Sequence, residues 1–252
     1  MAVKHYIPNG ITLLNLFCGC IAVLFAVDSN FAVAAFFVFL GVFFDFFDGF
    51  FARKLNVQSA LGLQLDSLAD MVTSGVVPGI VMFKLLELVT YSATDSVVDD
   101  WNSLYHFNSS FSSFIPFIGL FIPLASAYRL AKFNLDEEQK TYFKGLPTPA
   151  NTLLIVSLPL IIEFQNSNAI NGIILNLWFL IPLTLFSCFL LNAPVKLFAL
   201  KFKDWNFRDN AVRYIFLILS IVMLVTLHFA AIPLIIVFYV LLSVISEQMA
   251  KK

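Results

Sequence analysis

The sequence predicts an all-α, polytopic membrane protein folded as a helical bundle. Its 252 residues are 60% hydrophobic, 30 of them are Phe, and only 12% are charged. A soluble domain of this length carries roughly twice that share of charge. The apolar segments follow one another with almost no amphipathic break, which argues against a soluble helical protein with an apolar core. The long apolar runs are therefore interpreted as spanning helices.

We expect about eight spans, because each apolar run is close to the roughly 20 residues that cross a bilayer. The runs are 10–28, 31–52, 66–89, 113–132, 149–164, 170–192, 212–229 and 232–249. A short polar tip, Asp28–Asn30, separates the first two, and Ala231–Pro233 turns the chain between the last two. No repeat or soluble segment interrupts the pattern, so residues 1–252 are predicted to form a single integral membrane domain.

Positive charge sorts to alternate connections between these spans. The connections 28–30, 91–112, 164–170 and 230–233 contain no Lys or Arg. All but one of the Lys and Arg residues fall on the other side, which carries both chain ends. The positive-inside rule then predicts the cytoplasmic (inner) membrane, with both termini cytoplasmic. The net charge of −1 and the absence of a basic arm give no reason to expect a nucleic-acid partner.

Four aspartates lie near the cytoplasmic ends of the second and third spans, where charge is costly. Asp45 and Asp48 are three residues apart and share a helix face with Gly49 and Ala52. Arg53 follows Gly49 by one turn. Two acids and two small residues on one stripe leave a hollow beside the carboxylates.

A second stripe follows the connecting loop, where Gly62, Asp66 and Asp70 repeat at four-residue steps. Four carboxylates in a low-dielectric site repel one another or stay protonated, and divalent cations remove that repulsion. Mg²⁺ prefers oxygen ligands and commonly joins carboxylates to phosphates. Two such ions hold both the attacking and the leaving oxygen of a phosphoryl displacement. The cofactors expected are thus two divalent cations, Mg²⁺ or Mn²⁺, and the alternative is that the acids only cap helices.

The pattern Asp45-x2-Asp48-Gly49-x2-Ala52-Arg53-x8-Gly62-x3-Asp66-x3-Asp70 resembles the complete signature of the CDP-alcohol phosphatidyltransferase family. All eight fixed residues are present with the expected gaps, within about a tenth of the chain. The resemblance implies transfer of a phosphatidyl group from CDP-diacylglycerol, or a related CDP-linked donor, to an alcohol. It also implies a homodimer, which is common in the family.

The resemblance further implies a role for each fixed residue. The four aspartates would bind the two cations, and Asp70 would also be the catalytic base for the acceptor hydroxyl. Gly49, Ala52 and Gly62 would make room for the cytidine and diphosphate, and Arg53 would contact the diphosphate or support the structure. The fixed positions contain no Ser, Cys or His. Direct attack by the acceptor is therefore favoured, and a covalent route stays open.

Two other segments bear on the acceptor alcohol. Asn9, Thr12 and Asn15 form a polar stripe that fits either helix capping and packing or hydrogen bonding to a nucleotide or headgroup. Arg129 and Lys132 fit either anchoring at the cytoplasmic face or substrate binding. The segments that contain them are Pro8-Asn-Gly-Ile-Thr12, Tyr128-Arg-Leu-Ala-Lys-Phe-Asn134 and Phe143-Lys-Gly-Leu-Pro-Thr-Pro-Ala150.

These segments resemble the phosphatidylserine synthase branch of the family, with Lys132 where that branch commonly has Arg. Lysine keeps the charge without the planar fork that binds carboxylates in two places. The resemblance implies a phosphotransferase that makes phosphatidylserine and CMP from CDP-diacylglycerol and L-serine. It makes Arg129 a candidate for binding the serine carboxylate or the donor phosphate.

Three alternatives remain at this point. The same chemistry could use glycerol 3-phosphate or an inositol phosphate, although those acceptors call for a denser basic pocket than Arg129 and Lys132 provide. A membrane prenyltransferase also uses acidic helices and Mg²⁺, but lacks the Gly-x-x-Ala-Arg insert between acid pairs. A cation transporter would place its carboxylates nearer the midplane, often on broken helices.

Overall fold

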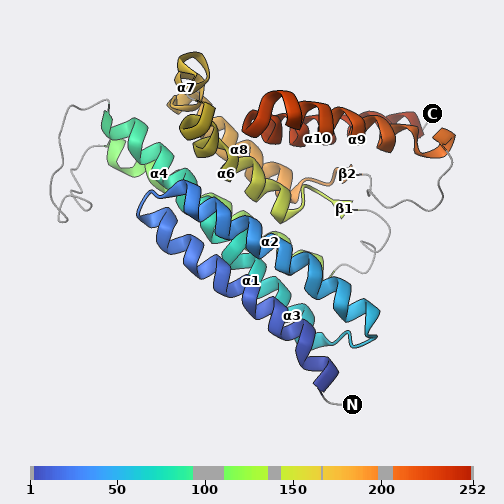
Figure 1. Ribbon diagram of the computed structural model, residues 1–252. Helices are drawn as coiled ribbons and strands as arrows, with labels where there is room; N and C mark the ends of the chain where they lie inside the picture. The colour runs from blue at the N-terminus through green and yellow to red at the C-terminus, as the bar shows by residue number, and fades with distance from the viewer. Residues whose placement is uncertain (1–2, 93–110, 136–142, 166, 198–206, 251–252) are drawn as a thin grey trace.

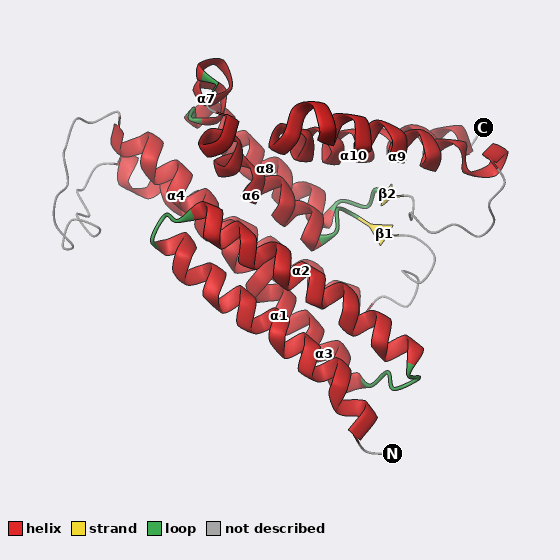
Figure 2. Cartoon of the chain, viewed as in Figure 1, coloured by secondary structure: helices red, strands yellow, loops and turns green. Residues whose placement is uncertain are grey.

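The computed structural model describes residues 3–92, 111–135, 143–165, 167–197 and 207–250, which fold almost entirely into helices (Figures 1 and 2). Most of the connection 91–112 and residues 136–142 lie outside the described residues. In chain order the helical elements are α1 (Val3–Val27), α2 (Phe31–Lys54), α3 (Ala60–Asp70), η1 (Met71–Val76), α4 (Val77–Ser92), η3 (Phe111–Leu120), α5 (Phe121–Leu135), α6 (Thr148–Gln165), α7 (Asn168–Ile174), α8 (Leu177–Asn192), α9 (Phe207–Leu227), η5 (His228–Ala230) and α10 (Ala231–Ala250).

Helices α1 and α2 pack against each other as a hairpin and bury small residues on both helices. Ala22 and Ala26 on α1 and Ala34 and Ala35 on α2 are all fully or almost fully buried. Small side chains let helix backbones approach closely in a membrane, where apolar burial alone gives little drive to associate. The turn is fixed by Asn30, whose side chain caps α2 by accepting a hydrogen bond from the Val33 amide. This hairpin holds the N-terminal end of α1 beside the C-terminal end of α2.

The third helical stretch, Ala60–Ser92, runs without a break through α3, η1 and α4. Its middle segment η1, Met71–Val76, has the wider turn of a π-helix and starts directly after Asp70. Single π turns inside α-helices occur frequently at functional sites. Helix α1 packs against α3, η1 and α4, so η1 lies deep in the bundle, and its residues Thr73–Gly75 are buried.

The second half of the bundle is joined at one end by a short antiparallel strand pair. Strand β1 (Phe143–Lys144) pairs with β2 (Lys196–Leu197). Gly145 follows with φ +75°, and its amide donates to the Val195 carbonyl. A side chain there would meet the Leu191 carbonyl oxygen at 2.5 Å, so the turn requires glycine. This connection sets the start of α6 against the end of α8.

By length and composition, six stretches can cross a membrane, or seven if the bent pair α7–α8 is one span. The seventh and eighth predicted spans, 212–229 and 232–249, fall mainly in Val212–Ser246, a 35-residue stretch that is counted as one candidate span. The Phe216 and Phe238 ring centroids within it are only 6.1 Å apart. A straight helix would separate these residues by about 33 Å, so α9 and α10 turn back on each other at η5 (Figure 1). The chain is therefore a multi-pass membrane protein.

Three predicted boundaries differ from the observed ones. Helix α1 begins at Val3 rather than at 10, since Pro8 near its start removes only one amide donor; Asn9 therefore lies inside the helix and does not cap it. The third span begins at Ala60 rather than at 66, where the Ser59 hydroxyl caps α3. The predicted helix 170–192 is broken by a 59° bend, and the Asn176 side chain caps α8 after the bend.

Close packing around Gly119 provides a test of the bundle. A Cβ added there would lie 2.5 Å from the backbone nitrogen of Phe83 on α4, and backbone cannot give way as a side chain can. We expect Gly119→Ala to lower the free energy of unfolding by about 1–3 kcal/mol, measured as a lower thermal midpoint in detergent. Gly172→Ala is the matched control, because nothing lies within 4 Å of its added Cβ. Equal midpoints for the two variants would contradict the α4–η3 contact.

Candidate metal centre and adjoining pocket

Three of the four predicted metal ligands come together where α2 meets α3. One carboxylate oxygen from each of Asp45, Asp48 and Asp66 lies within 4.8 Å of the others. Asp70 lies one turn beyond Asp66, only 9% exposed, and interacts with both Asp45 and Asp66. The helical spacing of the two acid pairs, three and four residues, therefore brings three of the four predicted carboxylates into one cluster, with Asp70 adjoining it.

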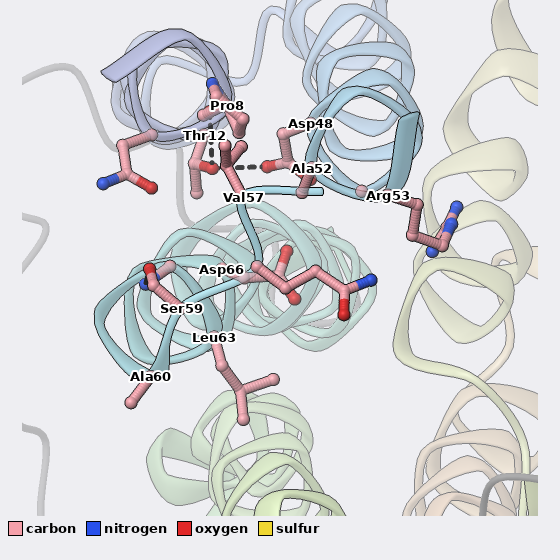
Figure 3. A pocket seen from close by; sticks show the side chains of 14 residues that line it. Pro8, Thr12, Asp48, Ala52, Arg53, Val57, Ser59, Ala60, Leu63 and Asp66 are labelled. Atoms are coloured by element: carbon pink, nitrogen blue, oxygen red, sulfur yellow. Dashed lines mark hydrogen bonds between the residues drawn. The ribbon is translucent and has the colours of Figure 1, made fainter. Parts of the chain in front are cut away.

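Helix α1 supplies hydrogen bonds to this acid cluster. The Thr12 hydroxyl donates to Asp48 Oδ2 at 2.6 Å, and Asp48 is only 5% exposed. Figure 3 shows Thr12 and Asp48 pointing toward one another from α1 and α2, with Asp66 on α3 across from them. One turn further along α1, Asn15 Nδ2 lies 3.4 Å from Asp70 Oδ1. Asn15 belonged to the predicted polar stripe, but its link to Asp70 could not be read from the sequence.

A cavity of about 480 Å³ opens beside the acids, and nearly all the predicted donor-site residues line it. They are Asn9, Thr12, Asp48, Gly49, Ala52, Arg53, Gly62 and Asp66. The sequence did not single out Pro8, or the loop and first turn of α3, as lining residues; these are Val57, Gln58, Ser59, Ala60 and Leu63. No periodic pattern marked that loop.

The two predicted glycines leave the space of the cavity open. A Cβ on Gly62 would meet Asn9 Oδ1 and Ser59 Oγ, both at 3.2 Å. A Cβ on Gly49 would lie 3.4 Å from Arg53 Nη1, so the guanidinium reaches back over the glycine. Arg53 itself is exposed and lies on the opposite side of the cavity from Thr12 (Figure 3). The cavity thus has carboxylates on one wall and a cation at its rim.

The two predicted acceptor-site residues do not line this cavity. Arg129 is buried on α5, 7% exposed, and its Nη1 donates to the Lys144 carbonyl at 3.1 Å. Lys132 is exposed one turn further along. On the same helix, Asn134 Nδ2 donates to Ser67 Oγ at 2.9 Å, which ties α5 to the turn of α3 between Asp66 and Asp70. The sequence analysis did not predict this hydrogen bond, because neither Asn134 nor Ser67 by itself indicates a partner on another helix.

The donor set fits divalent metal ions of the hard, oxygen-binding kind. Three carboxylates within 4.8 Å, in a half-buried site and without a described Lys or Arg in salt-bridge contact, carry excess negative charge. Mg²⁺, Mn²⁺ and Ca²⁺ favour carboxylate oxygen, whereas soft metals favour thiolate or imidazole. No Cys or His belongs to this described cluster. The acidic cluster could therefore hold a divalent cation beside the cavity.

A profile of CDP-alcohol phosphatidyltransferases matches residues 5–190, which include all the elements of the site. The chain belongs to the CDP-alcohol phosphatidyltransferase family. Family members use divalent metals, in agreement with the acidic cluster. The match ends before α9, so the family core consists of α1 to α8 and the α9–α10 hairpin lies outside it.

Individual relatives of this phosphatidyltransferase carry one name. A protein of Bacillus subtilis named CDP-diacylglycerol–serine O-phosphatidyltransferase is 36% identical over 158 residues, 61% of this chain and 75% of the relative. A protein of the same name from Methanocaldococcus jannaschii is 30% identical over 171 residues, 68% of this chain and 69% of the relative. One from Saccharomyces cerevisiae is 31% identical over 169 residues, 61% of this chain and 53% of the relative.

The acid cluster predicts a measurable metal affinity. We expect Asp66→Asn to weaken Mn²⁺ binding by the purified protein at least tenfold, because a carboxylate ligand and its charge are lost while shape is kept. Titration followed by the Mn²⁺ electron paramagnetic resonance signal measures this. Asp28→Asn is the control, since Asp28 is an exposed carboxylate in the α1–α2 turn. Unchanged Mn²⁺ affinity in the Asp66 variant would refute the assignment of this cluster as a metal centre.

Proposed function

We propose that this protein transfers the phosphatidyl group of CDP-diacylglycerol to the hydroxyl of L-serine, giving phosphatidylserine and CMP. The observation that carries the proposal is the Asp45–Asp48–Asp66 cluster, of which Asp48 and Asp66 line a cavity of about 480 Å³ at the ends of α1, α2 and α3. Membership in the family supports the donor and the transfer chemistry. The names of the relatives from three organisms support serine as the acceptor.

In the proposed reaction, the chain's own residues bind the donor and handle one proton. Gly49, Ala52 and Gly62 leave the cavity wide enough for the cytidine and diphosphate, and Arg53 reaches the diphosphate from the rim. The cations, two Mg²⁺ or Mn²⁺ held by Asp45, Asp48, Asp66 and Asp70, would supply Lewis-acid stabilisation of charge on the diphosphate. Thr12 and Asn15 orient two of these carboxylates through their hydrogen bonds.

Asp70 is the proposed catalytic base, because it is buried at the end of the acid cluster away from the open cavity. It takes the proton of the serine hydroxyl as the serine oxygen bonds to the lipid-bearing phosphorus. The bond from that phosphorus to the CMP oxygen breaks, and CMP leaves toward the cavity. One displacement is sufficient, since no Ser, Cys or His stands among the fixed motif residues.

The same proposal covers location and assembly. The Lys- and Arg-bearing connections favour the cytoplasmic membrane, with both termini and the active site on the cytoplasmic side. Family membership favours a homodimer. Phosphorylated acceptors are less suitable, because Arg129 is the one buried cation among the residues whose burial is described, and Lys132 is exposed.

The acceptor can be determined with purified protein, CDP-diacylglycerol and labelled L-serine in the presence of Mg²⁺. We expect labelled phosphatidylserine to form, and a 100-fold excess of glycerol 3-phosphate or an inositol phosphate to reduce it less than twofold. EDTA should stop the reaction, and added Mg²⁺ or Mn²⁺ should restore it. Product from glycerol 3-phosphate and none from serine would refute the serine assignment while leaving the family chemistry intact.

The base assignment predicts a large effect of Asp70→Asn. We expect kcat to fall by about 10²–10⁴-fold, the usual contribution of a general base, with a larger loss if metal binding is weakened as well. The rate of CMP release measures this. Glu163→Gln, at an exposed position near the C-terminal end of α6, should keep the wild-type rate. An Asp70 variant with normal turnover would exclude it as the base.

A further inference from the structure

A group of buried polar atoms without partners surrounds η1, directly beyond Asp70. Nine buried side-chain nitrogen or oxygen atoms of the described residues make no hydrogen bond, and five of them belong to Asn15, Ser74, Ser126 and Asn151. All four residues are fully buried. Buried polar groups are nearly always paired, so each exception needs a physical reason. Their concentration around one six-residue segment indicates a common cause.

Successive residues of η1 face three different helices, and each contact brings one of these groups to the segment. The Thr73 hydroxyl donates to the Asn15 carbonyl on α1 at 3.2 Å. The Thr152 hydroxyl on α6 donates to the Ser74 carbonyl at 2.8 Å, and the buried Asn151 directly precedes Thr152 on α6. A Cβ on Gly75 would lie 3.2 Å from that of Ser126 on α5.

Asn151 is the most informative member of the group. Its side chain has an exposed fraction of 0%, and neither its amide nitrogen nor its amide oxygen has a partner. Leaving a buried amide unpaired destabilises the protein, whereas an apolar side chain would fill the space without that cost. The link between α6 and η1 is made by Thr152, so Asn151 is not needed for it. The amide is therefore available to a bound molecule.

The charge nearest to these groups along α5 is that of Arg129, one turn after Ser126. It is buried, and its side chain donates to the Lys144 carbonyl. The salt bridge of the described residues, Lys84–Glu87, lies elsewhere, so no described carboxylate neutralises Arg129. A buried cation one turn from Ser126, together with the buried neutral oxygens of this group, suits a small molecule that carries both a negative and a positive group.

Resting on the proposed function, we propose that Asn151 and Ser74 bind the ammonium group of the amino-acid acceptor. Asn151 Oδ1 and Ser74 Oγ accept hydrogen bonds from the ammonium, while Arg129 binds the carboxylate. The acceptor hydroxyl then faces Asp70, the residue that immediately precedes η1. Neutral oxygens recognise an ammonium here without adding a carboxylate that would compete for the cations. The site selects a small zwitterion with a hydroxyl group.

The test compares Asn151→Ala and Ser74→Ala with wild type in phosphatidyl transfer. We expect the KM for L-serine to rise about tenfold or more in Asn151→Ala and severalfold in Ser74→Ala, with the KM for CDP-diacylglycerol changed less than twofold. The thermal midpoint without serine should stay level or rise, because the substitutions remove unpaired polar atoms. A purely structural role would lower the midpoint and leave the KM for serine unchanged, which would overturn the proposal.

Two inhibitors test recognition of the ammonium group and of the carboxylate separately. Ethanolamine keeps the ammonium and lacks the carboxylate, and 3-hydroxypropionate does the opposite. Asn151→Ala should weaken inhibition by ethanolamine and not that by 3-hydroxypropionate; the reverse result would refute the assignment. Asn171→Ala is the matched control, since its amide oxygen is also unpartnered but lies on α7, at the far end of α6. Wild-type protein that makes no lipid from serine would instead refute the proposed function.

Discussion

The structure depends on holding several carboxylates close together near the edge of a membrane. At oxygen separations within 4.8 Å, each ionised pair among Asp45, Asp48 and Asp66 repels by about 3.5 kcal/mol or more at an effective dielectric of about 20. Such an arrangement persists only if cations, hydrogen bonds or protonation offset the repulsion. The α1–α2 hairpin, the small residues at its contact and the Thr12 hydrogen bond all serve to keep the acids in place against it.

This constraint also explains why the two sides of the acid cluster differ. On one side, α1, α2 and α3 leave an open cavity lined by small residues, which suits a large charged donor with lipid tails. On the other side, η1 is enclosed by α1, α5 and α6, and its polar groups are sealed from water. In the proposed reaction the donor and the acceptor approach from these two sides, and Asp70 stands between them. Exclusion of water from the acceptor side would limit hydrolysis of the donor.

Much of this arrangement could be predicted from the sequence because it repeats along single helices. The spacing of Asp45 and Asp48, and of Asp66 and Asp70, fixes their faces without knowledge of any partner. Composition and the sorting of Lys and Arg predicted the bundle and its spans, apart from the early start of α1, the cap at Ser59 and the bend before α8.

The remainder depends on contacts between helices, which leave no period in the sequence. Asn134 bonds to Ser67 across 67 residues, and Asn15 bonds to Asp70 across 55. A lone Asn in an apolar span is equally suited to packing, capping or binding, and only its neighbours decide between them. Arg129 shows the same limit, because its charge was evident but its burial apart from the donor cavity was not.

The packing around η1 connects rigidity with recognition. Gly19 and Gly41 both abut Thr73 so closely that a Cβ on either would collide with it, which fixes one side of η1 against α1 and α2. With that side held, Ser74 cannot turn to find a partner at low cost. Polar groups that are already held in place lose little conformational entropy when a ligand binds. More of the free energy of each hydrogen bond to the ligand is then available as binding affinity. The stability lost by leaving them unpaired is, in this interpretation, the physical basis for selecting an amino-acid acceptor.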